Sequence, residues 1–359
     1  MWLAFLYSSI HQLAMITDAR ALRPEQVPQD LHHREGQIDH LSTVLDSTGT
    51  ARSEDVCIFG PSGAGKTTIA KHTLGLLERE ALHVRWGYVN CMSESTPSAA
   101  LHRLLRDAGI GADLRREGTH KAAAIDRLRE CDEQVICVID EVDVLDDPSL
   151  LLSLYQIPNV AQILITTKQD EWLAEVGTRA ESRFRSAESI QLEKYSHREL
   201  VDILDARVVH GLISARVADN AVAHIADLAA GDARQGIVLL RRAAHYVEKN
   251  DVRELTAEVV DGIVKDAEAD LRDRRIRSLG THKRLLYEIV REAGSLDSGT
   301  LHARYEDRSL SPKARSTRRK YLKSLRRYDL IASEGTGRST MYQHVEPDGT
   351  IRSAAAPAE

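Results

Sequence analysis

The chain of 359 residues has few cysteines, few aromatic residues and no long apolar run. Its four cysteines form no C-x-x-C pair, which argues against a zinc module or a disulfide framework and fits a reducing cytoplasm. Aromatic residues make up only 4%, so the cores must be built from Leu, Val, Ile and Ala. The apolar stretch at residues 1–10 lacks a basic start and is too short to cross a bilayer, so we expect no membrane association.

Charge is distributed unevenly along the chain. The formal net charge is −6, yet residues 272–346 hold 18 Lys and Arg against 9 Asp and Glu. That segment therefore carries +9, whereas residues 1–271 carry −14. An acidic body with a basic C-terminal region predicts a partner with a phosphate backbone. A solvated charged surface is the alternative.

Residues 60–67 match the phosphate-binding pattern G-x-x-x-x-G-K-[ST]. An apolar segment at 55–59 predicts a strand before this loop, and residues 68–77 predict a helix after it. Glycines allow the backbone to approach an anion, and the helix N-terminus adds positive charge. We expect Lys66 to bridge the β- and γ-phosphates and Thr67 to ligate Mg²⁺. The predicted nucleotide contacts are Gly60, Pro61, Ser62, Gly63, Ala64, Gly65, Lys66, Thr67 and Thr68.

A second apolar run, residues 134–139, ends in Asp140 and Glu141. Such a run is typical of a strand buried on both faces of a parallel sheet, and ligands bind at the carboxyl ends of these strands. We expect Asp140 to hold Mg²⁺ and Glu141 to polarise the attacking water as a general base. A buried strand followed by a chance acidic turn is the alternative.

Two other segments have polar residues that could reach a nucleotide. The predicted strand 161–166 is followed by Thr167, which could contact the γ-phosphate or instead cap the next helix. Residues 33–35 precede the phosphate loop. They could touch the adenine or form only the N-terminal cluster of a helix.

Arginines at three positions suit phosphoryl transfer. Arg183 or Arg185 could enter a neighbouring molecule's site, although an arginine on a helix is more often a surface residue. Arg234 lies in the first turn of a predicted helix that Asp232 could cap. A cation there opposes the helix dipole, and a bound phosphate would explain its presence.

The pattern of predicted elements divides the chain into three domains. Strands alternating with helices predict an α/β domain with a parallel sheet, and an uninterrupted helical region predicts an all-α lid. Three helices at 281–293, 298–305 and 312–327, followed by a glycine-turned hairpin, predict a winged helix. The expected boundaries are 15–194, 195–275 and 276–346; residues 347–359 are expected to be a disordered tail, and 1–14 an over-extended reading frame or a short packed helix.

The third helix of the predicted winged helix is strongly basic. Its cations could neutralise backbone phosphates and read base edges in the major groove, and the hairpin tip could enter a minor groove. Winged helices also mediate protein contacts, which is the alternative. The predicted DNA contacts are Lys313, Arg315, Arg318, Arg319, Lys323 and, at the hairpin tip, Arg338.

The order of these parts resembles the AAA+ replication initiators, most closely the archaeal family related to the first origin recognition complex subunit and the cell division control ATPase. The resemblance spans about residues 15–346. Its specific pieces are Val27-Pro28 with His33-Arg34-Glu35, the phosphate loop, Val89-Asn90-Cys91, Ile139-Asp140-Glu141 and Gly231-Asp232-Ala233-Arg234.

The resemblance implies a role for each matching residue. Lys66 and Thr67 belong to Walker A, and Asp140 and Glu141 to Walker B. Thr167 falls at sensor 1, where these proteins often have Asn. The remaining implied assignments are Arg183 as the arginine finger, Arg234 as the sensor 2 arginine, Val27 and Arg34 as nucleotide contacts, and residues 96–120 as the initiator-specific insert that touches DNA.

By this resemblance the protein is expected to bind ATP or ADP with Mg²⁺ and to bind double-stranded origin DNA in the cytoplasm, at the nucleoid. It would promote loading of an MCM-type helicase, with slow hydrolysis as a switch, and could associate with itself or with paralogous initiators. A transcription regulator or transposition ATPase with a winged helix is one alternative. A non-catalytic adaptor that holds ADP is the other.

Overall fold

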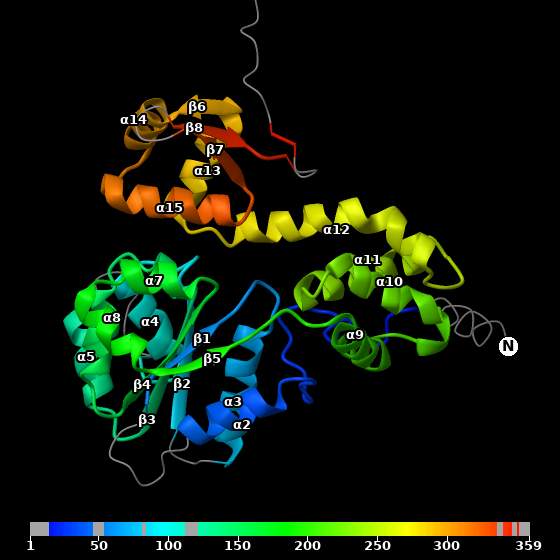
Figure 1. Ribbon diagram of the computed structural model, residues 1–359, viewed down its shortest axis with the longest axis horizontal. Helices are drawn as coiled ribbons and strands as arrows, with labels where there is room; N and C mark the ends of the chain where they lie inside the picture. Colours follow the sequence, from blue (N-terminus) through cyan, green and yellow to red (C-terminus); the bar gives the residue numbers. More distant parts are fainter. Residues whose placement is uncertain are drawn as a thin grey trace, which may run out of the picture.

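The computed structural model describes residues 14–45, 54–80, 84–111, 121–335, 340–346 and 350–351. Figure 1 shows a sheet domain with a helical domain beside it and a small helix-and-strand domain above both. This is the predicted succession of α/β domain, lid and winged helix. Residues 1–13, for which we expected an over-extended reading frame or a short helix, lie outside the described residues.

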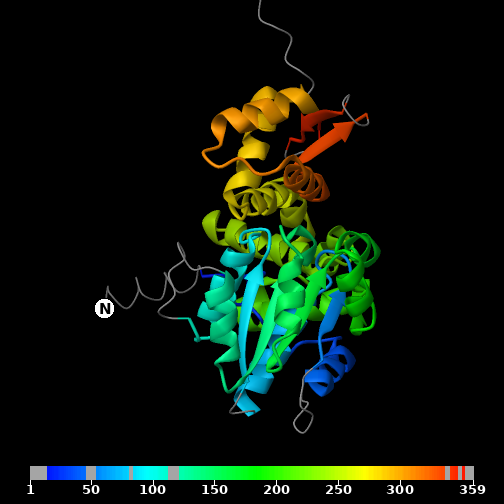
Figure 2. The same cartoon turned by 90° about the vertical axis from the view of Figure 1, so that its left-hand side faces the viewer.

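Five parallel strands form the central sheet. They run in the order β2-β3-β4-β1-β5, which places the strand before the phosphate loop between β4 and β5. Because all five are parallel, their carboxyl ends lie at one edge of the sheet. Figure 2 shows the strands side by side beneath the small domain. The strands are β1 (Val56–Phe59), β2 (Val84–Asn90), β3 (Gln134–Asp140), β4 (Val160–Thr166) and β5 (Glu188–Gln191).

Helices cover both faces of the sheet, and alternate strand residues point to each face. Val56 and Ile58 of β1 pack with α2 (Glu35–Leu45) and α3 (Lys66–Glu80). The intervening Cys57 and Phe59 pack in the cluster on the opposite face. The helices on that side are α4 (Pro97–Asp107), α5 (Lys121–Arg129), α6 (Ser149–Tyr155), α7 (Gln169–Glu175) and α8 (Thr178–Arg185).

The lid has its own hydrophobic core, which also takes in the start of the described chain. Met15 and Leu22 are fully buried in the same cluster as the lid helices. Apolar side chains that precede the sheet domain in the chain thus complete the lid core. The lid helices are α9 (His197–Gly211), α10 (Asp219–Ala229), α11 (Ala233–Lys249) and α12 (Ala257–Arg277), and α12 continues to the small domain.

The small domain is a winged helix with three helices and a three-stranded antiparallel sheet in the order β6-β8-β7. The third helix begins later than predicted, because Ala314, which follows Pro312 and Lys313, has a non-helical ψ of 152° and serves as its N-cap. The second helix extends further, to Arg308. The elements are α13 (Thr281–Ala293), β6 (Ser295–Asp297), α14 (Ser298–Arg308), α15 (Arg315–Arg327), β7 (Ile331–Glu334) and β8 (Met341–His344).

The winged helix is packed against the sheet domain. Tyr321 and Leu322 of α15 belong to the same buried cluster as Met92, which follows β2. The Ser324 hydroxyl lies 3.2 Å from the Met92 sulfur. From α13, the buried Lys283 Nζ donates to the carbonyl oxygens of Cys91 at 3.2 Å and Met92 at 3.4 Å. Apolar contacts and a buried cation thus join the two domains.

Among the described residues, no helix combines the length and the apolar character that a membrane span requires. All four cysteines have free thiols, as the sequence predicts.

Candidate functional site

The phosphate loop connects β1 to the N-terminus of α3 in a conformation that depends on glycine. Gly63 and Gly65 have φ values of 74° and 91°, in the left-handed region. A Cβ at Gly63 would lie 2.1 Å from the Asp232 carboxylate, and one at Gly65 would lie 2.6 Å from the Tyr195 hydroxyl. Side chains from the lid and its junction therefore pack directly on the loop.

Lys66 and Thr67 begin α3 and line a cleft of about 990 Å³. Lys66 Nζ donates to the carbonyl oxygens of Gly60 at 2.8 Å and Pro61 at 2.7 Å. Burial lowers the pKa of Lys66 below its usual value, while the charges of Glu141 and Asp140 act against that shift. The ammonium thus lies in a buried position close to both acids, where a phosphate oxygen would replace the loop carbonyls as its partner.

Asp140, at the end of β3, collects three hydrogen bonds. Its Oδ2 accepts from the Thr67 hydroxyl and from the Tyr88 hydroxyl, each at 2.8 Å, and its Oδ1 accepts from the Glu141 N–H at 2.9 Å. The Thr67 and Asp140 oxygens are the hard donors that Mg²⁺ prefers, so the pair fits the predicted metal site. Burial, followed by the Asp140 charge, raises the pKa of Tyr88, which keeps this hydroxyl protonated as a donor.

Glu141 has a left-handed backbone, with φ 56°, although it is not glycine. Such strain is concentrated at functional sites. Its carboxylate forms an ion pair with Arg327 of α15, which also pairs with Asp143. Burial lowers the pKa of Arg327, but the charges of Glu141 and Asp143 outweigh that effect and raise it overall. The predicted general base is therefore held by a cation from the winged helix.

Thr167 follows β4 and lines the cleft. Its Oγ1 is buried without a hydrogen-bond partner. The alternative that it caps the next helix is wrong, because α7 begins without a side-chain cap and it is Thr166 Oγ1 that accepts from the Lys168 N–H, at 3.3 Å. A buried hydroxyl without a protein partner suits a γ-phosphate contact.

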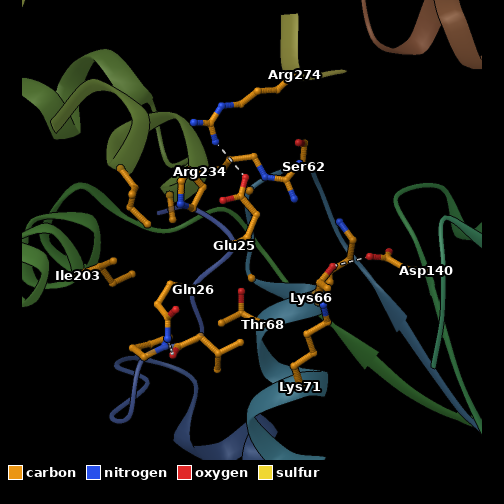
Figure 3. Close-up of a pocket in the computed structure, with 18 of the residues that line it drawn as sticks. Glu25, Gln26, Ser62, Lys66, Thr68, Lys71, Asp140, Ile203, Arg234 and Arg274 are labelled. Carbon is orange, nitrogen blue, oxygen red and sulfur yellow. Dashed lines mark hydrogen bonds and ion pairs between the residues drawn. The ribbon is translucent and has the colours of Figure 1, made fainter. Parts of the chain in front are cut away.

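The lid contributes Arg234, an exposed residue in the first turn of α11 that lines the cleft. Asp232 caps this helix by accepting from the Gln235 N–H at 2.9 Å. The Ala233 N–H donates to the Gly63 carbonyl oxygen at 3.3 Å, which ties the lid to the phosphate loop. Figure 3 shows Lys66 and Asp140 on the sheet side of the cleft, and Arg234 and Ile203 on the lid side.

The cleft brings together most of the predicted nucleotide contacts. The sequence-predicted residues that line it are Val27, Ser62, Gly63, Gly65, Lys66, Thr67, Thr68, Asp140, Glu141, Thr167 and Arg234. The carbonyl oxygens of Gly60 and Pro61 accept hydrogen bonds from Lys66. The carbonyl oxygen of Ala64 instead accepts a hydrogen bond from Arg34.

Arg34 is a correction to the prediction. Its side chain is buried behind the loop, where Nη2 donates to the carbonyl oxygens of Glu193 at 2.8 Å and Ala64 at 3.3 Å. Its guanidinium also stacks over Tyr195, 4.1 Å from the ring centroid. These contacts hold Arg34 against the loop and outside the residues that line the cleft, an arrangement that favours the alternative of a structural cluster before α2.

Arg183, the predicted arginine finger, lies on α8. Its guanidinium stacks over the ring of Tyr155, 3.9 Å from the centroid. The neighbouring Arg185 pairs with Glu181 at 2.8 Å on the same helix. The role of Arg183 in a neighbouring molecule's site stays a prediction.

Some of the cations of helix α15 are exposed, and others are paired with neighbouring residues. Arg315 and Arg319 are exposed. Arg318 is a correction: its side chain is only 6% exposed, pairs with Glu306 at 2.6 Å and donates to the His302 carbonyl at 3.2 Å, so it holds α15 to α14.

Two further predicted DNA contacts are qualified by the structure. Lys323 is exposed but pairs with Glu175 of α7 at 2.6 Å. Lys313 is partly exposed just before α15. Arg338 lies outside the described residues, as do positions 112–120 of the predicted insert, whose α4 packs its apolar face on the sheet.

Sequence reasoning missed Tyr88 and Arg327. The alternation of β2 places Tyr88 on the same side as Asn90, so its position beside Asp140 could have been found from the strand period. Arg327 is 186 residues from Glu141, and no local signal indicates that pairing.

Comparison with known proteins supports this description. A family model described as an AAA domain matches residues 54–170, and one described as a Cdc6 AAA+ ATPase-type lid domain matches residues 201–264. The chain is 36% identical to ORC1-type DNA replication protein 9 of Halobacterium salinarum, over 92% of this chain and 94% of that protein. It is 34% identical to ORC1-type DNA replication protein 1 of the same organism, over 84% and 98%.

Solved structures share the fold. The Aeropyrum pernix ORC1 protein in complex with DNA aligns with a TM-score of 0.70 and 24% identity, over 92% of this chain and 93% of that one. The Aeropyrum pernix ORC2 protein in its ADP form aligns with a TM-score of 0.64 and 22% identity, over 93% and 95%. The resemblance that the sequence motifs indicated is confirmed: the chain belongs to the family of ORC1-type DNA replication proteins, the AAA+ initiators with a Cdc6-type lid.

Proposed function

We propose that the protein is an ATP-dependent initiator that binds duplex DNA at a replication origin and promotes loading of an MCM-type helicase. The observation that carries the proposal is the convergence of Lys66, Thr67, Asp140, Thr167 and Arg234 on one cleft between sheet domain and lid. Family membership supplies the replication context. Slow hydrolysis of ATP acts as the switch between a DNA-engaged and a released state.

Each residue of the cleft has a role in this proposal. Lys66 and the loop N–H groups bind the β- and γ-phosphates, and Thr67 and Asp140 would hold Mg²⁺, which would neutralise the charge that develops on the leaving ADP. Glu141 takes a proton from water as the water oxygen bonds to the γ-phosphorus and the bond to the ADP oxygen breaks. Thr167 and Arg234 contact the γ-phosphate, and Arg234 thereby draws the lid toward the sheet domain.

The winged helix provides the DNA-binding surface. The exposed cations at the start of α15 suit a duplex backbone and its major groove. Aeropyrum pernix ORC1 has been solved in complex with DNA, and Drosophila ORC bound to DNA shares the fold with a TM-score of 0.54. We further propose that the protein works at the nucleoid alongside paralogous initiators, and that Arg183 leaves Tyr155 to enter a neighbour's site on DNA.

Nucleotide binding is tested with Lys66→Ala. The substitution removes the charge that meets the β- and γ-phosphates, so titration with a fluorescent ATP analogue should detect no binding. Lys249→Ala, an exposed lysine at the end of α11, serves as the matched control and should bind like wild type. If Lys66→Ala bound the ATP analogue with undiminished affinity, residues 60–67 would not be a phosphate-binding loop.

The origin role is tested by genome-wide DNA immunoprecipitation of the tagged protein. One peak or a few peaks, coinciding with sites where replication starts, would support an initiator. Scattered promoter peaks would instead support a transcription regulator with the same domains. ADP that stays bound through purification, together with no turnover, would support the non-catalytic adaptor.

A further inference from the structure

The C-terminal half of α15 is seated on the sheet domain and reaches its nucleotide cleft. Arg327 donates from both terminal nitrogens, one to Glu141 and the other to Asp143. The pair is largely buried, with side-chain exposures of 15% for Arg327 and 18% for Glu141. The Tyr328 hydroxyl accepts a further hydrogen bond from Arg327 at 2.8 Å. The guanidinium is thus held on three sides at the edge of the cleft.

This position has a consequence for the reaction proposed above. A general base must have a free lone pair directed at the water it activates. Glu141 uses a carboxylate oxygen to pair with Arg327, and a buried pair of this kind fixes the orientation of both groups. With α15 seated, Glu141 is restrained by a cation from another domain.

Other contacts hold the same face of α15 in place. Lys323, one helical turn before Arg327, pairs with Glu175 at 2.6 Å and Glu171 at 3.4 Å, both on α7. The Tyr321 hydroxyl donates to Asp146 at 2.7 Å. Figure 1 shows α15 lying directly above α7. The contacts made by Lys323, Tyr321 and Arg327 therefore all require the winged helix to stay in this one position against the sheet domain.

The DNA-facing cations are on this same helix. Arg315 and Arg319 lie toward its N-terminus and are exposed, and Lys323 is an exposed cation whose partners belong to the sheet domain. A duplex phosphate near Lys323 would compete with Glu171 and Glu175 for the ammonium. Contact between α15 and DNA would thereby weaken the seat of the helix on the sheet domain.

We propose that Arg327 is a latch on the proposed ATPase: it restrains Glu141 while the winged helix is seated, and duplex DNA bound to α15 releases it. This inference rests on the proposed function. Arg327 is a positioning residue here, since it acts through Glu141. Hydrolysis is then slow in the free protein and faster on DNA.

The test compares Arg327→Ala with Arg326→Ala, the exposed neighbouring arginine. Turnover of ATP is measured with and without a duplex, and fluorescent-ATP titration confirms that each variant retains a folded site. Arg327→Ala should hydrolyse ATP about tenfold faster than wild type without DNA, and DNA should accelerate it no further. Arg326→Ala should behave like wild type. When wild type hydrolyses ATP, turnover in Arg327→Ala equal to or below that of wild type overturns the latch, because a merely structural ion pair would not restrain catalysis.

A second variant keeps the inference testable if Arg327→Ala does not fold. Glu171→Gln with Glu175→Gln breaks the pairs between α15 and α7 but leaves the cleft and the basic residues intact. It should also raise turnover without DNA, and unchanged turnover counts against the latch.

Amide hydrogen exchange separates the latch from the proposed function. The C-terminal half of α15 should exchange faster in Arg327→Ala, and in wild type after duplex is added. If wild type and variants bind ATP but none hydrolyses it, the proposed switch fails. The exchange data then decide whether α15 is released. If Arg327→Ala exchanges like wild type, the latch fails and the proposed function is unaffected.

Discussion

At the nucleotide cleft, a single hydroxyl joins the phosphate loop to the acidic strand end. Thr67 Oγ1 lies 2.8 Å from Asp140 Oδ2, and the two oxygens are positioned to share a cation. Thr67→Ala removes one ligand, so we expect affinity for ATP in the presence of Mg²⁺ to fall by about tenfold or more. Titration of a fluorescent ATP analogue with Mg²⁺ and with EDTA measures this effect.

The matched control is Thr67→Ser, which keeps the hydroxyl and should keep the dependence on Mg²⁺. Wild type should lose affinity in EDTA, whereas Thr67→Ala should bind equally weakly in both conditions. If Mg²⁺ enhances binding by Thr67→Ala as much as by wild type, Thr67 is not a metal ligand.

Among the elements, the N-terminus of α11 couples the lid to the loop. Asp232 caps this helix and lies next to Gly63. Asp232→Ala removes the cap, and we expect the free energy of unfolding to fall by about 1 kcal/mol. Urea unfolding measures the loss. Asp232→Asn, which can still cap, should retain most of the stability; equal losses in both variants would mean that the carboxylate charge matters and the cap does not.

Helix α15 offers a comparison of two adjacent arginines. Arg319 is exposed, so Arg319→Ala should weaken duplex binding across sequences and reduce the slope of log affinity against log salt by about 1. Arg318 is buried and donates to the His302 carbonyl, so Arg318→Ala should instead lower the free energy of unfolding by about 1–2 kcal/mol.

Salt-dependent fluorescence anisotropy on a labelled duplex, together with urea unfolding, distinguishes these two effects. If Arg318→Ala lost DNA affinity completely but kept full stability, Arg318 would be a DNA contact and its structural role between α15 and α14 would be wrong.

In the whole molecule, Lys283 links the winged helix to the sheet domain through a buried ammonium. Burial lowers its pKa from 10.5 to about 8. Below that pH the lysine is charged in both states, and the folded protein bears the full cost of burying the charge. Between the two pKa values the unfolded chain binds a proton that the folded protein lacks, so this contribution to stability rises with pH.

We therefore expect wild type to gain stability relative to Lys283→Met as pH rises. Urea unfolding at pH 7.5 and 9.5 should show a relative gain of about 2 kcal/mol, and the comparison cancels the other groups that titrate. Lys249→Met, at an exposed lysine, should show no such trend. A constant difference between wild type and Lys283→Met would mean that Lys283 stays charged when buried.

Much of the site followed from patterns within short segments. The loop at 60–67, the apolar run ending at Asp140 and the capped start of α11 each depend on residues close together in the chain. The parallel sheet then brings the strand ends to one edge, so the meeting of Thr67 with Asp140 could be predicted. Local spacing and the topology of the sheet were sufficient to predict this contact, because the backbone path alone brings the two residues together.

Other features depended on packing between distant segments. The start of the described chain completes the lid core, Arg34 is turned behind the loop, and Arg318 is buried against α14. From the sequence alone, the first segment is recognisable only as apolar, and Arg34 and Arg318 only as cations that suit a phosphate ligand. Whether each of these side chains is buried or exposed depends on the segment that packs over it, and that segment can come from any part of the chain.

The sequence by itself determined the three domains, the phosphate loop and the acidic strand end, because helix and strand periods and a contiguous motif specify them. Only the tertiary structure decided that Arg327 reaches Glu141, across 186 residues, and that Lys283 is buried against the backbone that follows β2. The reason is physical: an ion pair between domains depends on how two folded surfaces meet, and no periodicity in either segment encodes the other.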